Sequence, residues 1–92
     1  MNNLQNYILN SDFSVESFDN EILLYSIRDS KGIYLNETAY IVLELCMKNQ
    51  HVEKIIMLLE KTFPQQKAEI RGDVIKTIMS LIENGVLIKT HE

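Results

Sequence analysis

The stretch "YLNETA", residues 34–39, constrains the fold of this chain most strongly, because the hydrophobic periodicity changes there. Before it, apolar residues alternate with polar ones or form short runs rich in strand-forming side chains. After it, apolar residues recur every three or four positions, as on one face of a helix. Asn36 can cap a helix by accepting a hydrogen bond from a free backbone N–H, and Glu37 suits the positive end of the helix dipole. The junction therefore predicts a strand that passes directly into a helix.

Three strands are predicted before this junction, over 13–18, 21–27 and 33–35. Asp19-Asn20 is a two-residue turn signal, since both residues tolerate positive φ, and the polar stretch 28–32 forms the second turn. Residues 1–12, rich in Asn and Gln, are interpreted as a loosely held lead-in with room for one helical turn.

Three helices are predicted after the junction, over 37–48, 52–62 and about 69–83, with a loop over 63–69 around Pro64. His51 stands at the N-cap of the second helix, where imidazole is a poor substitute for Ser or Thr, and we interpret it as an exposed boundary residue. Asn84-Gly85 ends the third helix, and 86–89 forms a tail strand or an extended segment. The predicted core stripes are Ala39, Val42, Leu43 and Cys46; Val52, Ile55, Ile56, Leu59 and Phe63; and Ile70, Val74, Ile78 and Leu81.

This order predicts an α+β fold: one small winged helix-turn-helix-like domain over residues 1–92, with a three-stranded antiparallel sheet followed by three helices.

Composition and motifs favour binding over catalysis. The net charge is −4, from nine basic and thirteen acidic residues, and the basic residues are scattered, so we expect no nucleic-acid partner. No stretch approaches the roughly 20 apolar residues that span a bilayer, and the N-terminus lacks a secretory signal, so we expect a cytoplasmic protein without a membrane partner. Cys46 is the only cysteine, and His51 and His91 lie forty positions apart, which predicts no metal site. No phosphate loop or catalytic constellation is present, and we expect no cofactor.

Three segments together resemble the PqqD family, which acts in pyrroloquinoline quinone biosynthesis. They are "ILLYS…KGIYLNETAYIVLELC", "HVEKIIMLLEKTFP" and "AEIRGDVIKTIMSLIENGVL". The chain departs from the family pattern at Met47-Lys48, where Asp-Gly is usual, and at His51, where Thr or Ser is usual. The resemblance implies a non-catalytic chaperone, a RiPP recognition element, that binds the leader segment of a ribosomally made precursor peptide. It also implies presentation of that peptide to a modifying enzyme, such as a radical S-adenosylmethionine enzyme or a leader peptidase.

In similar domains the leader adds as a strand to the edge of the third strand, over a groove walled by the third helix. An edge strand can template a peptide in this way, because one row of its backbone groups is unpaired. On the third helix, Ile75, Met79 and Ile82 widen the apolar arc beyond one packing face; they either line the groove or pack against the sheet, the tail or the N-terminal segment. Arg71 could meet a leader carboxylate or carbonyl, or extend into solvent. The predicted peptide-binding residues are Ile33, Tyr34, Leu35, Arg71, Ile75, Ile78, Met79 and Ile82.

Two other functions fit the same layout: a DNA-binding winged helix, and an adaptor that docks a protein partner without binding a leader. An open strand edge would also permit a homodimer.

Overall fold

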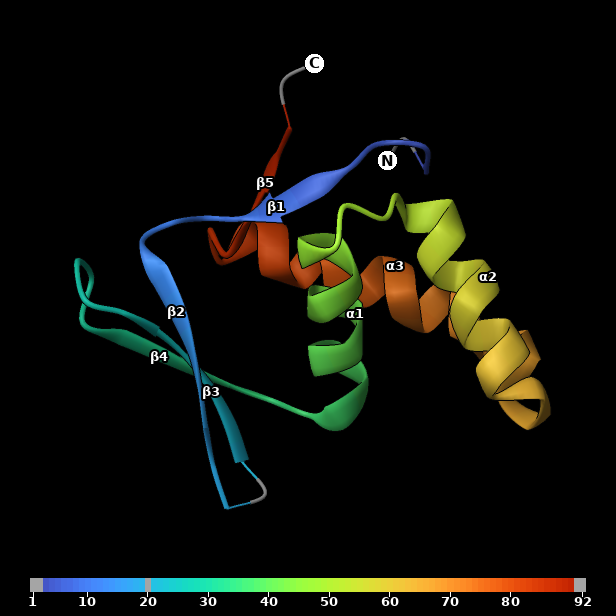
Figure 1. The fold of residues 1–92 in the computed structure, drawn as a ribbon, viewed down its shortest axis with the longest axis horizontal. Coiled ribbons are helices and arrows are strands. Elements are labelled where there is room, and N and C mark those ends of the chain that lie inside the picture. The colour runs from blue at the N-terminus through green and yellow to red at the C-terminus, as the bar shows by residue number, and fades with distance from the viewer. Residues whose placement is uncertain (1–2, 20, 91–92) are drawn as a thin grey trace.

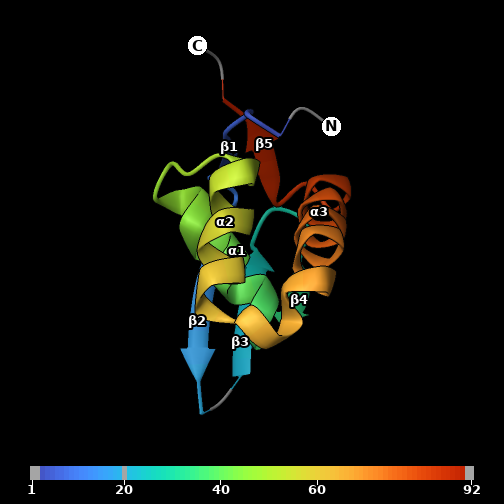
Figure 2. The same cartoon turned by 90° about the vertical axis from the view of Figure 1, so that its right-hand side faces the viewer.

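The computed structural model describes residues 3–19 and 21–90 (Figures 1 and 2). Asn20 of the predicted turn, and His91, lie outside the described residues. The elements in chain order are β1 (Tyr7–Leu9), β2 (Phe13–Phe18), β3 (Glu21–Ser26), β4 (Lys31–Leu35), α1 (Glu37–Met47), α2 (Val52–Thr62), the 3₁₀ turn η1 (Pro64–Gln66), α3 (Lys67–Glu83) and β5 (Leu87–Lys89). The predicted α+β order, a three-stranded antiparallel sheet followed by three helices, is confirmed.

The main sheet has the order β2-β3-β4, with β4 at one edge. Leu24 lies at its centre, opposite Val15 of β2 and Ile33 of β4, and is fully buried. The edge strand is longer than predicted, because Lys31 and Gly32 pair with β3 instead of belonging to the turn. The backbone of β4 is therefore held over five residues before the chain enters α1.

The N-terminal segment is the main correction to the predicted fold. Residues 7–9 were expected to belong to a loose lead-in, but they form β1, which pairs antiparallel with β5. The pairing places Tyr7 opposite Lys89 and Leu9 opposite Leu87. Three residues are too few to show a strand period in the sequence, and their partner lies at the other end of the chain. The tail was expected to be either a strand or an extended segment. It is a strand, β5, because it pairs with β1.

The helices lie to one side of the main sheet, with α1 between the sheet and α2 (Figure 1). Their predicted core faces are largely confirmed, since Val42, Leu43, Cys46, Val52, Ile55, Ile56, Leu59, Ile70, Val74, Ile78 and Leu81 are buried. Ala39 is only partly buried, and Phe63 at the end of α2 remains 38% exposed. The buried apolar residues of sheet and helices form one cluster.

Side chains and glycine set the helix ends. Asn36 caps α1 as predicted, its Oδ1 accepting the Ala39 N–H at 2.8 Å. The interpretation of His51 as a mere boundary residue was wrong: it is half-buried, and its Nδ1 accepts the Lys54 N–H at 3.1 Å, so the imidazole caps α2. Gly85, with φ of +76°, ends α3 as predicted, since a residue with a side chain is strained there.

Cys46 is buried, as expected for a small core residue. Burial raises the pKa of its thiol to about 12, because a thiolate is poorly solvated among apolar side chains. Within the described residues, no helix is both long and apolar enough to cross a bilayer. The same residues contain no group of three His, Cys, Asp or Glu side chains placed to hold a metal ion.

Candidate functional site

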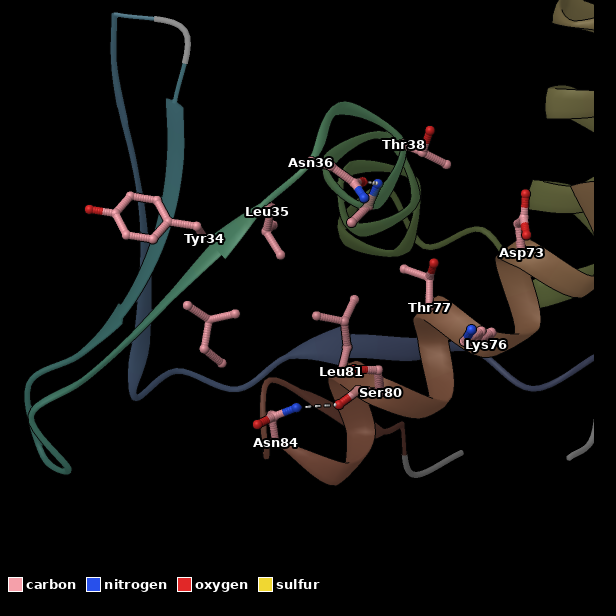
Figure 3. A pocket seen from close by; sticks show the side chains of 12 residues that line it. Tyr34, Leu35, Asn36, Thr38, Asp73, Lys76, Thr77, Ser80, Leu81 and Asn84 are labelled. Atoms are coloured by element: carbon pink, nitrogen blue, oxygen red, sulfur yellow. Dashed lines mark hydrogen bonds between the residues drawn. The ribbon is translucent and has the colours of Figure 1, made fainter.

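A groove of about 490 Å³ lies beside the edge strand β4 (Figure 3). It is bounded by β4, by the start of α1 and by one flank of α3. Its lining residues are Ile33, Tyr34 and Leu35 from β4, Asn36, Thr38 and Ala39 from the junction and α1, and Asp73, Lys76, Thr77, Ser80, Leu81 and Asn84 at α3.

The strand β4 gives the groove an open backbone edge. Within the described residues it pairs with β3 alone, so its other edge has no strand partner. Its side chains alternate: Ile33 and Leu35 are half-buried, whereas Tyr34 is 65% exposed and points away from α3 (Figure 3). Backbone groups of an edge strand that face a groove can pair with an added strand.

The facing side of α3 is polar. We call Asp73, Lys76, Thr77, Ser80 and Asn84 the groove flank of α3. The Lys31 ammonium donates to Asn84 Oδ1 at 3.1 Å and so joins the start of β4 to the end of α3. The Asn84 amide donates to the Ser80 carbonyl at 2.8 Å. With Ile33, Leu35 and Leu81 below this flank, the groove combines an apolar floor with a wall of hydrogen-bonding side chains.

The structure separates the predicted site residues into two groups. Ile33, Tyr34 and Leu35 line the groove, and their contact with a peptide stays a prediction. The residues predicted on α3 do not: Ile78 is fully buried in the core, and the other four occupy what we call the distal flank of α3, which is Arg71, Ile75, Met79 and Ile82.

Helix geometry explains this correction. Successive residues of an α-helix are rotated by about 100°. Measured from Val74 in the buried stripe, the groove flank falls on one side of the core and the distal flank falls on the other. Of the distal residues, Ile75 packs against the core cluster, while Met79 is 50% exposed and Ile82 is 37% exposed. The extra apolar arc of α3 is real, but it does not face β4.

Arg71 is occupied elsewhere. Its guanidinium donates to Glu53 of α2 in a two-pronged ion pair, at 2.6 Å to Oε1 and 3.0 Å to Oε2. The Asn3 amide donates to the same carboxylate at 3.2 Å. The hydrogen bonds from Arg71 hold the pKa of the Glu53 carboxyl below its usual value. Arg71 therefore links α3 to α2, rather than reaching into the groove.

Sequence reasoning missed the groove flank because it took apolar side chains as the mark of a binding surface. The available signal was the spacing of Asp73, Thr77 and Ser80, which places three polar side chains on one side of a helix. A solvated helix face carries the same pattern, so the spacing alone does not reveal the groove.

Comparison with known proteins agrees with this architecture. The family model described as "Coenzyme PQQ synthesis protein D (PqqD)" matches residues 21–87, from β3 to the start of β5, which includes every residue lining the groove. No curated protein matches the chain.

Two solved structures share the fold. "Lasso peptide synthetase B1 complexed with the leader peptide" has a TM-score of 0.81 and 20% identity, over 90% of this chain and 98% of that one. "TbiB1 in Complex with the TbiA(beta) Leader Peptide" has a TM-score of 0.77 and 12% identity, over 92% of this chain and 99% of that one. Since the family model covers well over half of the residues, the chain belongs to the PqqD family.

Proposed function

We propose that this chain binds the leader segment of a ribosomally made precursor peptide and presents it to a modifying enzyme, without catalysing a reaction itself. The observation that carries the proposal is the open edge of β4 beside a groove whose far wall is α3. Two proteins of the same fold were solved with leader peptides, which supports this use of the fold. Because the ligand is made on ribosomes, we propose that the protein acts in the cytoplasm. We also propose that the chain forms a single domain.

Strand addition gives the peptide a defined arrangement. A leader segment paired along β4 would gain backbone hydrogen bonds, and its side chains would alternate in direction. One set would enter the groove, toward Ile33, Leu35 and the groove flank of α3. The other set would lie on the side of Tyr34. The groove set should therefore be apolar near the strand and able to hydrogen-bond near Thr77 and Ser80.

The partner enzyme is one that modifies precursor peptides carrying a leader segment. A radical S-adenosylmethionine enzyme and a leader peptidase are the two classes that we propose. The groove flank holds one cation, Lys76, beside the carboxylate of Asp73, which is a poor match to a phosphate backbone. A gel shift at low salt should therefore show only weak, sequence-independent DNA binding.

Strand addition is tested by removing peptide N–H donors one at a time. The probe is a short peptide selected for binding to this chain, N-methylated at single positions and measured by fluorescence polarisation. Because alternate residues of a strand donate to the same neighbour, methylation should weaken binding at every second position. Uniform sensitivity along the peptide, or none, would exclude strand addition.

A matched pair of substitutions locates the binding surface. Thr77→Arg places a long side chain in the groove, whereas Met79→Arg places the same side chain on the distal flank. Thr77→Arg should weaken leader binding by at least about tenfold, a typical loss for a blocked contact near an interface centre. Met79→Arg should bind as the unsubstituted protein does. The reverse result would restore the distal flank as the binding surface.

A further inference from the structure

We infer that the groove continues into a second subsite, which holds an apolar side chain of the same peptide with a Lys or Arg next to it. The inference rests on the proposed function and extends it, because it specifies which leader residues beyond the added strand are recognised.

The subsite is a pocket of about 230 Å³ among the three helices. Its apolar walls come from Ile41 of α1, from Leu59 and Phe63 at the end of α2, and from Ile70 and Val74 of α3. Leu59, Ile70 and Val74 are nearly or fully buried, but Phe63 keeps 38% of its surface exposed. A Phe left open at the mouth of an apolar pocket offers a contact surface of the size of one peptide side chain.

The pocket adjoins the groove. Thr38 of α1 and Asp73 of α3 line both, so the two cavities lie next to each other at these side chains. This place lies beyond the C-terminal end of β4, where the chain has turned into α1. A peptide that is paired along β4 and continues past Leu35 therefore runs toward the pocket. If it pairs antiparallel, it reaches the pocket with residues before its strand; if it pairs parallel, with residues after it.

The negative charge at the pocket mouth favours a basic residue next to the apolar side chain that the pocket holds. Among the described residues that line the pocket, Glu37 and Asp73 carry carboxylates and none is Lys or Arg. An apolar peptide side chain in the pocket places its sequence neighbours close to this rim. A Lys or Arg there would be attracted to both carboxylates, and an Asp or Glu would be repelled.

Random peptides displayed on phage provide a probe that does not depend on the identity of the precursor. A length of about twelve residues suffices, since at about 3.3 Å per residue it spans β4 and continues past it. We expect the selected peptides to combine an alternating segment with a flanking apolar residue next to Lys or Arg. The best peptide is then synthesised whole and without its flank, and both forms are titrated by fluorescence polarisation.

The whole peptide should bind about tenfold tighter than the truncated one. Phe63→Ala should remove this difference, weakening the whole peptide and leaving the truncated one unchanged. Glu37→Gln should weaken binding of the whole peptide severalfold. This second variant still tests the subsite if Phe63→Ala lowers the melting temperature. The matched controls are Met57→Ala on α2 and Glu83→Gln at the end of α3, two exposed residues outside both cavities. Neither should affect either peptide.

The outcomes separate this inference from the proposed function. If the truncated peptide binds as tightly as the whole one and Thr77→Arg abolishes both, the groove stands and the second subsite is refuted. If no selected peptide is sensitive to Thr77→Arg, the proposed function fails, and this inference fails with it. If the flank matters but carries no basic residue, the charge selection at Glu37 and Asp73 is refuted.

Discussion

Replacing Asn36 by Ala should both destabilise the fold and weaken peptide binding, because the Asn36 side chain caps α1 at the strand-to-helix junction. The substitution removes the 2.8 Å hydrogen bond from the Ala39 N–H to Asn36 Oδ1 and leaves that donor without its cap. Such a loss costs about 1 kcal/mol, which lowers the melting temperature of a domain of this size by about 4–8 °C. The first turn of α1 also carries Thr38 and Ala39, which line the groove. Fraying of that turn should therefore weaken leader binding, by no more than about fivefold if the cap energy is the limit.

Thermal melts followed by circular dichroism, together with leader titrations, test this reasoning. Asn36→Ser is the matched control, since a serine hydroxyl can accept the same N–H, and it should melt within about 2 °C of the unsubstituted protein. If Asn36→Ala and Asn36→Ser melt alike, the cap does not account for the role of Asn36. If Asn36→Ala melts lower but binds the leader with unchanged affinity, the junction stabilises the fold without shaping the groove.

Three further predictions follow from the core and the caps. Ile78→Asp should unfold the domain by burying a charge, whereas Met79→Asp should retain both the melt and the leader affinity, as circular dichroism and titration can show. His51→Ala should cost about 1 kcal/mol in urea unfolding and His51→Asn should recover most of it; equal losses would argue against capping. Burial raises the pKa of Cys46 from 9.0 to about 12. The thiol of the unfolded chain ionises first, so the contribution of Cys46 to stability should be fully present below pH 9 and fall by about 1.4 kcal/mol per pH unit between these values, while Cys46→Ala should lack this contribution to the slope.

The fold could be predicted where the sequence itself carries a period or a cap. The stripes of the three helices, the Asn36 cap and the Gly85 stop are local signals, and the structure confirms them apart from the exposed Phe63 and the partly buried Ala39. The strand at Tyr7–Leu9 could not be predicted, because its pairing partner lies at the far end of the sequence. His51 was misjudged for another reason: cap preferences rank residue types, but the ring Nδ1 is placed by the actual geometry of the turn.

The candidate site was predictable on its strand side and not on its helix side. β4 follows from the order of strands, since the third strand of a meander is an edge. Which flank of α3 faces that edge depends on the direction in which the helix crosses the core, since reversing that direction would exchange the flank of Thr77 for the flank of Met79. Packing of the buried residues of α3 against the rest of the core decides this arrangement, and the pairs of Arg71 with Glu53 and of Lys31 with Asn84 accompany it. Neither pairing is visible in the sequence.

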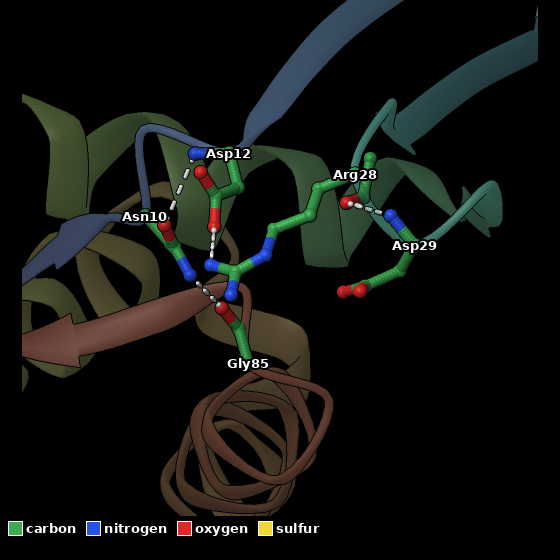
Figure 4. A network of polar contacts seen from close by, with 6 residues as sticks. Asn10, Asp12, Arg28, Asp29 and Gly85 are labelled. Carbon is green, nitrogen blue, oxygen red and sulfur yellow. Dashed lines mark hydrogen bonds and ion pairs between the residues drawn. The ribbon is translucent and has the colours of Figure 1, made fainter.

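The pairing of β1 with β5 has a consequence for the order in which the chain folds. It joins the first and the last strand of the described chain. The linker after β1 is held to the turn before β5 as well, because the Asn10 amide donates to the Gly85 carbonyl at 2.9 Å (Figure 4). The hairpin contacts of β2, β3 and β4 are short-range and close at little entropic cost, whereas β1 must find a partner across nearly the whole chain. We therefore expect β1 to dock late in folding and its amides to exchange hydrogen faster than those of β3. The groove, built between β4 and α3, could then form and hold a peptide before the two ends of the chain meet.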